Sequence, residues 1–136
     1  MDNTAGRKSK MFSVKIVRLY KHLSINKQET VLSEQLLRTG TGIGATLARA
    51  GCAAGRQEFL DMLYAALKSC AETKYWLELL NDTALITEYE YHNTIDDCEE
   101  LRRLLAAGIK HMQAPRQPGE KPADPAQRFP AVSAGE

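Results

Sequence analysis

RTGTGIGATLARAGCAAG, residues 38–55, holds five of the nine glycines of this chain. From Gly40 onward it fits the spacing G-x-G-x-x-A, which binds dinucleotide phosphates when a buried strand ends just before the first glycine. The preceding residues, ETVLSEQLLRT, are instead rich in helix formers, place Leu32 and Leu36 on one helical face, and show no strand-like alternation. No Lys-Ser or Lys-Thr follows the last glycine, which excludes a P-loop. The stretch therefore predicts a helix.

Small residues in this stretch recur at helical spacing and form a smooth strip. Such a strip lets a neighbouring helix approach closely and gain dispersion contacts along the backbone. Each interior glycine costs about 1 kcal/mol of helix propensity relative to alanine, so tertiary or subunit contacts must offset that cost. The residues that we expect to pack against another helix are Gly40, Gly44, Ala48, Gly51 and Gly55.

Helical periodicity continues along most of the chain. Thr87 followed by Glu90 matches a capping box, in which hydroxyl and carboxylate each accept a free amide at a helix start. Helices joined by short turns favour an antiparallel up-and-down bundle. The fold class that we expect is therefore all-α, a four-helix bundle with helices over about residues 9–23, 30–54, 56–80 and 87–112.

Prolines and charges divide the chain further. All five prolines lie in the last 22 residues, and proline blocks helix interiors. We therefore expect a flexible basic lead over residues 1–8, the bundle over 9–112, and a disordered proline-rich tail over 113–136. Basic side chains concentrate in residues 1–27 and acidic ones in 72–100. This segregation suits an anionic partner, or complementary helices or subunits.

The sequence shows no arrangement typical of catalysis, of a metal site or of a cofactor site. Its three histidines have no ligand spacing, and Cys52, Cys70 and Cys98 are widely spaced, as is usual for reduced thiols in the cytoplasm. No apolar run approaches the roughly 20 residues that span a membrane. We expect a cytoplasmic, non-enzymatic protein with no cofactor, metal or membrane segment.

Basic side chains gather on two predicted helix faces. Those of the first helix share one side, and the arginines of the glycine-rich helix fall within about 20° of one another on a 3.6-residue period. Arginine matches phosphate oxygens, and clustered cations gain from counterion release, so both faces suit RNA or DNA. The alternative is that they are solvated or pair with acidic residues of the fourth helix. The residues concerned are Lys15, Arg18, Lys21, Arg38, Arg49 and Arg56.

An apolar surface is expected on the third helix. With Phe59 and Leu63 inward, Tyr75, Trp76 and Leu79 project away from the core. Aromatic residues left outside in this way are typical anchors of a subunit interface. The alternative is a slightly rotated helix that places Trp76 in its own core.

Four segments carry a resemblance to a known family. They are FSVKIVRLYKHL (12–23), LSEQLLRTGTGIGATLARA (32–50), FLDMLYAALKSCAETKYWLELL (59–80) and DDCEELRRLL (96–105). Over residues 8–112 the chain resembles the four-helix bundle proteins encoded in intervening sequences of 23S ribosomal RNA genes.

The resemblance implies a four-helix bundle without enzymatic activity that assembles with itself, as a pentameric ring in related proteins. A more distantly similar protein, the accessory variability determinant of diversity-generating retroelements, is a basic pentamer that binds nucleic acid and a reverse transcriptase. A scaffold that binds a protein partner, without nucleic acid, is the alternative function. This chain has Gly42 where the family often has serine, Thr46 where asparagine is frequent and Arg49 where an acid is usual. The change at 49 means that a charged surface cannot be carried over.

Overall fold

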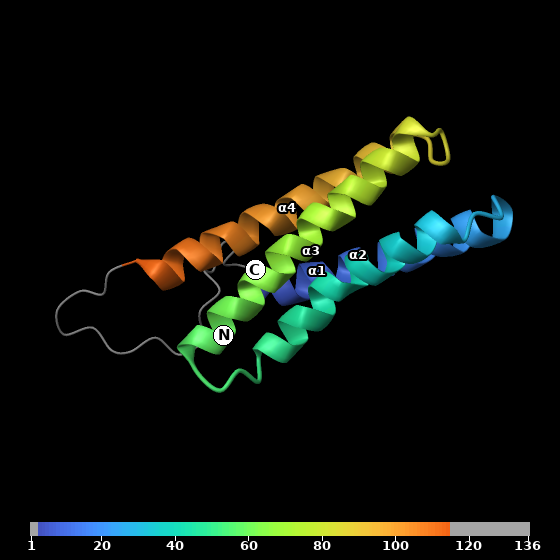
Figure 1. Ribbon diagram of the computed structural model, residues 1–136. Coiled ribbons are helices and arrows are strands. Elements are labelled where there is room, and N and C mark those ends of the chain that lie inside the picture. The colour runs from blue at the N-terminus through green and yellow to red at the C-terminus, as the bar shows by residue number, and fades with distance from the viewer. Residues whose placement is uncertain (1–2, 115–136) are drawn as a thin grey trace, which may run out of the picture.

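The computed structural model describes residues 3–114 and confirms an all-α, up-and-down four-helix bundle (Figure 1). Successive helices run antiparallel, so α1 and α3 begin at the end where α2 and α4 finish. We name this end the terminal end, and the end where the two helical hairpins turn the tip. The helices are α1 (Thr4–Lys21), α2 (Val31–Ala50), α3 (Arg56–Asp82) and α4 (Glu88–Gln113), with a π-helical turn, η1 (His22–Asn26), after α1.

One apolar core runs along the bundle, and all four helices contribute to it. Phe12, Ile16, Ile43, Leu63 and Leu105 are almost completely buried, as their helical spacing predicts. Burial of each such side chain contributes about 1.5–3 kcal/mol to stability. The core therefore follows directly from the 3.6-residue pattern.

Two helix boundaries differ from the prediction. α1 begins at Thr4 because the Asn3 side chain caps it, its Oδ1 accepting a hydrogen bond from the Gly6 amide at 3.2 Å. The expected flexible lead over residues 1–8 is therefore wrong for 4–8. α2 ends at Ala50, four residues earlier than predicted. The amides of Cys52 and Ala53 there form turn hydrogen bonds to the preceding carbonyl oxygens. Most of the predicted tail, from residue 115, lies outside the described residues.

The start of α4 confirms the predicted capping box. Thr87 Oγ1 accepts the Glu90 amide at 3.0 Å, and Glu90 Oε1 accepts the Thr87 amide at 2.8 Å. These bonds satisfy free amides of the first turn and place the acidic part of α4 at the tip.

Contacts between the helices fix their register. Ile16 lies against Gly40, Gly42 faces Ser69, and Cys98 contacts Cys70. These contacts lie near the middle of the bundle. They divide the described chain into a terminal half, residues 3–15, 42–69 and 99–114, and a tip half, residues 16–41 and 70–98.

Candidate functional site

Two of the predicted nucleic-acid-binding residues are held by partners inside the bundle. Lys15 Nζ pairs with Asp97 and donates to Asn93 Oδ1 at 3.0 Å, which ties α1 to α4. Arg38 on α2 pairs with Glu72 on α3 at 2.8 Å. A cation that already faces a carboxylate gains less from a phosphate, so these two positions contribute little to a basic surface.

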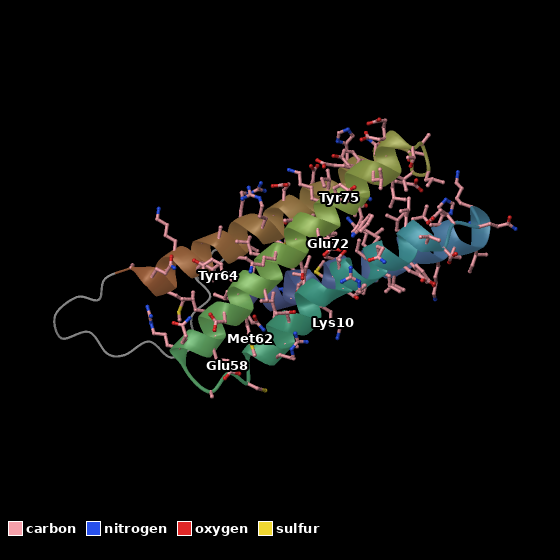
Figure 2. All side chains as sticks on the ribbon, in the orientation of Figure 1. Lys10, Glu58, Met62, Tyr64, Glu72 and Tyr75 are labelled. Atoms are coloured by element: carbon pink, nitrogen blue, oxygen red, sulfur yellow. The ribbon has the colours of Figure 1, made fainter. Side chains whose placement is uncertain are left out.

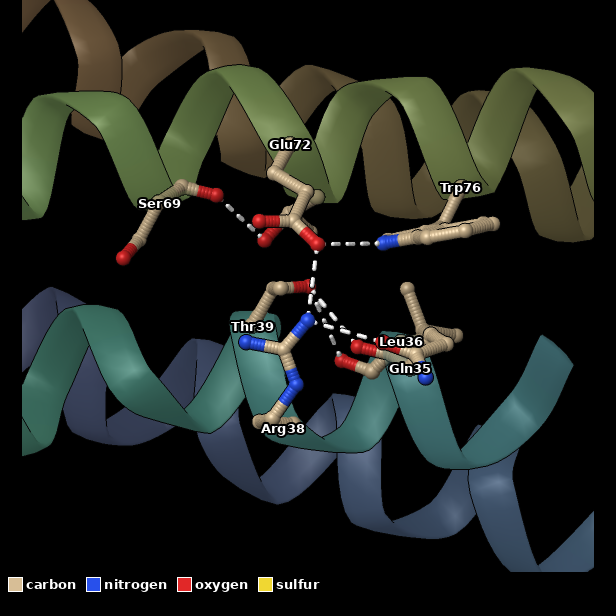
Figure 3. A network of polar contacts seen from close by, with 8 residues as sticks. Gln35, Leu36, Arg38, Thr39, Ser69, Glu72 and Trp76 are labelled. Atoms are coloured by element: carbon tan, nitrogen blue, oxygen red, sulfur yellow. Dashed lines mark hydrogen bonds and ion pairs between the residues drawn. The ribbon is translucent and has the colours of Figure 1, made fainter. Parts of the chain in front are cut away.

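Arg38 belongs to a polar network across the α2–α3 interface, shown in Figure 3. Glu72 Oε2 accepts hydrogen bonds from Trp76 Nε1 at 3.0 Å and from Arg38 at 2.8 Å, and Arg38 also donates to Gln35 at 2.7 Å. The Trp76 hydrogen bond, followed by Arg38, holds the pKa of the Glu72 carboxyl below its ordinary value. The network therefore keeps Glu72 ionised and fixes the indole against the bundle.

The other four predicted cations do not form one surface. Arg18 and Lys21 are exposed on α1 in the tip half, whereas Arg49 ends α2 and Arg56 begins α3 at the terminal end. None of the four pairs with a carboxylate within residues 3–114, and Arg49 donates only to Thr46 Oγ1, at 3.2 Å. These four cations therefore lie toward opposite ends of the bundle and do not form the two basic faces that the sequence predicts.

Antiparallel packing sorts the charges of the sequence along the bundle. The terminal half carries ten basic and four acidic side chains, a net formal charge of +6. The tip half carries five basic and nine acidic ones, a net charge of −4. The segregation that the sequence shows between residues 1–27 and 72–100 therefore becomes a polarity between the two ends.

Exposed cations of all four helices lie in the terminal half, and sequence reasoning found only two of them. Neither Lys10 on α1 nor Lys110 on α4 pairs with a carboxylate within the described part of the chain. The nearby acids are otherwise engaged, since Glu58 accepts the Ala54 amide at 3.3 Å and Asp61 accepts from Gln57 at 2.8 Å. The set that we name the terminal cluster is Lys10, Arg49, Arg56 and Lys110.

The glycine strip packs on α1 over part of its predicted length. An added Cβ at Gly40 would lie 2.9 Å from Ile16 Cγ1, and one at Gly44 would lie 3.2 Å from Ser9 Oγ. The prediction for Gly51 and Gly55 is wrong, because α2 ends before them and an added Cβ there would meet no neighbouring helix.

Ala48 is exposed instead of covered by a neighbouring helix. It lines a groove of about 330 Å³ between the first half of α1 and the last half of α2. Small residues such as Gly6, Ser9 and Gly44 line the same groove, and Lys10 stands at it. The smooth strip therefore continues past the packed region as open surface.

The apolar surface expected on α3 exists in modified form. Tyr75 is 56% exposed and stands near the tip, far along α3 from Glu58 and Met62 (Figure 2). Trp76 and Leu79 are half-buried, and Trp76 packs against the core. The expectation that Trp76 projects away from the core is therefore wrong, and the alternative of a slightly rotated α3 is the one that the structure shows. Sequence reasoning missed Val31 of α2, which is 71% exposed at the same end.

Comparison with known proteins identifies the family. The model of the 23S rRNA-intervening sequence protein family matches residues 1–107. This chain belongs to that family. It is 45% identical to a protein with unknown function from the S23 ribosomal protein family of Bacteroides thetaiotaomicron, whose crystal structure matches with a TM-score of 0.79. That match covers 80% of this chain and 97% of the other. No curated protein matches.

The cysteines of this 23S rRNA-intervening sequence family member lie in different surroundings. Cys52 is exposed, whereas Cys70 and Cys98 are buried, and the Cys98 thiol donates to the Cys70 carbonyl oxygen at 3.5 Å. Contact with Cys98, together with burial, raises the pKa of the Cys70 thiol far above its usual range. Cys70 therefore stays protonated and is a poor nucleophile.

The described residues contain neither a group of metal ligands nor a helix suited to a membrane. Within residues 3–114, no group of three or more His, Cys, Asp or Glu side chains is placed to hold a metal ion. No helix in that part of the chain has the length and apolarity needed to cross a membrane.

Proposed function

We propose that this protein is a non-enzymatic binding protein that holds the phosphate backbone of RNA or DNA at the terminal end of its bundle. The observation that carries the proposal is the terminal cluster. Lys10, Arg49, Arg56 and Lys110 come from four different helices, lie in the half with a net charge of +6, and have no carboxylate partner among residues 3–114.

The chemistry of the cluster suits phosphate better than bases. Arginine and lysine release counterions when they meet a polyanion, which makes binding strong at low salt and independent of sequence. The two most exposed aromatic side chains of the described residues, Tyr75 and Tyr89, lie in the tip half, away from the cluster. In the terminal half, the Tyr64 hydroxyl accepts a hydrogen bond from Gln113 Nε2 at 2.9 Å. The acidic tip repels the polyanion and orients the bundle with its terminal end toward it.

The proposal includes assembly of the protein with itself. The family resemblance implies a pentameric ring, and we propose that this chain forms one. Parallel copies in a ring would bring several terminal clusters to the same side. One polyanion could then contact more than one cluster, which raises its effective affinity without any new type of contact.

A salt series with matched variants tests nucleic-acid binding. We expect log affinity for a fluorescent duplex RNA to fall linearly with log salt concentration. Arg49→Ala and Arg56→Ala should each reduce the slope by about one per chain. Arg38→Ala and Lys15→Ala are the controls and should leave the slope unchanged, because Glu72 and Asp97 already neutralise those cations.

Two outcomes would contradict the proposal. The first is no binding at low salt by the folded protein, which would favour the scaffold alternative. The second is equal loss of slope in the control variants, which would mean that the terminal cluster is not the contact surface.

A further inference from the structure

An exposed seam runs along the outer side of α1. Its residues are spaced alternately by four and three, so they form one stripe opposite the buried residues Phe12 and Ile16. The stripe is apolar at Met11, Val14 and Ile25, which are 65%, 44% and 69% exposed. We name it the α1 seam, and it consists of Arg7, Met11, Val14, Arg18, Lys21 and Ile25.

The α2–α3 face has complementary chemistry. Near the tip it presents apolar side chains together with the exposed carboxylate of Glu34, which has no ion pair or hydrogen bond within the described residues. The half-buried Trp76 beneath is held by Glu72, so this surface is rigid. We name it the tip patch, and it consists of Val31, Glu34, Tyr75 and Leu79.

A shallow stretch of small residues continues from the tip patch toward the terminal end. Ala45 and Ala65 are exposed there, and an added Cβ at Gly42 would meet only Ser69 Oγ, at 4.0 Å. Unlike Gly40, Gly42 is therefore not required by any close approach inside the described chain. A helical glycine costs about 1 kcal/mol of propensity, so contact with a second molecule would offset a cost that packing within the bundle does not.

The two surfaces match in level along the bundle. Ile16 contacts Gly40, and Arg38 pairs with Glu72. This register places residues 18–25 of the seam level with residues 31–38 of α2 and the tip patch of α3. By the same register, Val14 is level with Gly42 and Ser69.

We infer that the α2–α3 face of one copy receives the α1 seam of a second copy, with the two bundles running in the same direction. Lys21 then faces Glu34, Ile25 meets Val31, and Val14 lies over Gly42. Arg18 lies level with the Arg38–Glu72 ion pair. An antiparallel copy would set Arg18 and Lys21 toward Arg49 and Arg56, which repel them. The inference rests on the proposed self-assembly and names its two surfaces, which differ and so build a head-to-tail ring.

Charge reversal with rescue tests the pairing. Sedimentation equilibrium without nucleic acid should show K21E and E34K each dissociating about 10-fold more easily, because like charges then face each other. The double variant K21E/E34K, with both surfaces reversed, should recover assembly. The control K27E reverses one exposed cation outside both surfaces and should assemble normally. Circular dichroism verifies that every variant is folded.

A second arm is independent of charge. Gly42→Leu adds a side chain at a position where a Cβ meets only Ser69 Oγ, at 4.0 Å. The helical signal and the melting temperature at low chain concentration should therefore persist while assembly is lost. Wild-type assembly by both charge variants, or a folded double variant that stays apart, would overturn the seam–patch pairing and leave the nucleic-acid proposal intact. A wild-type protein that remains monomeric would overturn the pairing and the proposed ring together, whereas the salt series would still test the terminal cluster.

Discussion

Glycines lie on both flanks of α2, but they are closely packed on one flank and loosely packed on the other. On the flank toward α1, Gly40 lies directly on Ile16 and Gly44 on the serine hydroxyls of α1. On the flank toward α3, an added Cβ at Gly42 would meet only Ser69 Oγ, at 4.0 Å, and the contact is carried by the Arg38–Glu72–Trp76 network. One flank is joined by close backbone approach and the other by polar side chains. Glycines two residues apart therefore have different physical roles.

Gly40→Ala should have the largest effect on this contrast. Its Cβ would lie 2.9 Å from Ile16 Cγ1, and Ile16 is fully buried and cannot move aside. Overpacking costs about 1–3 kcal/mol, and the gain in helix propensity returns about 1 kcal/mol. We expect the free energy of unfolding, measured by urea denaturation, to fall by about 1–2 kcal/mol. Ile16→Ala should relieve part of that loss, and strict additivity of the two changes would argue against the clash.

Gly42→Ala should act in the opposite direction. The added methyl group meets nothing closer than Ser69 Oγ at 4.0 Å, so only the helix propensity changes. At low chain concentration, where association does not contribute, urea denaturation should show a gain of about 1 kcal/mol. A loss of stability would show that α3 packs more closely on this flank than the structure indicates.

Gly44→Ala should fall between these two. Its Cβ would approach Ser9 Oγ at 3.2 Å, a contact that offsets the gain in propensity. We expect a change within about 0.5 kcal/mol in the wild-type background. In a Ser9→Ala background the same change should become stabilising, and the difference between the two backgrounds measures the contact.

The polar flank should respond to pH with the smallest effect. Because the folded pKa of Glu72 is lowered, its contribution to stability is present above the unfolded pKa and is lost as the pH falls through the folded pKa. Trp76 is the only tryptophan, so its fluorescence should report this titration with a midpoint below the ordinary glutamate pKa. Glu72→Gln should remove the transition, and its persistence would assign it to another carboxyl group.

Much of the fold follows from local pattern. The burial of Phe12, Ile16 and Leu105 and the capping box at Thr87 were predictable, because helical periodicity and capping depend on residues a few positions apart. The start of α1 was missed although Asn3 is a favoured capping residue, since the polar segment after it has little periodicity. The end of α2 was placed too late because small residues fit a helix strip and a turn equally well.

The candidate site was less predictable than the fold. Arg56 and Arg49 were found as basic residues, but their presence in the same half of the bundle as Lys10 and Lys110 depends on antiparallel packing. The exposure of Val31 beside Tyr75 likewise depends on how α2 lies against α3. A single helical pattern gives the direction of a side chain but not its neighbour on another helix.

The sequence alone determined four amphipathic helices, their core and the family, because these depend on residue spacing and on matching segments. Tertiary structure decided which cations stay available and which glycines are covered. Lys15 meets Asp97 and Arg38 meets Glu72 across helices, and Gly40 rather than Gly42 lies under Ile16. The physical reason is that electrostatic and packing energies depend on distance in space, and these pairs become close only when the helices associate.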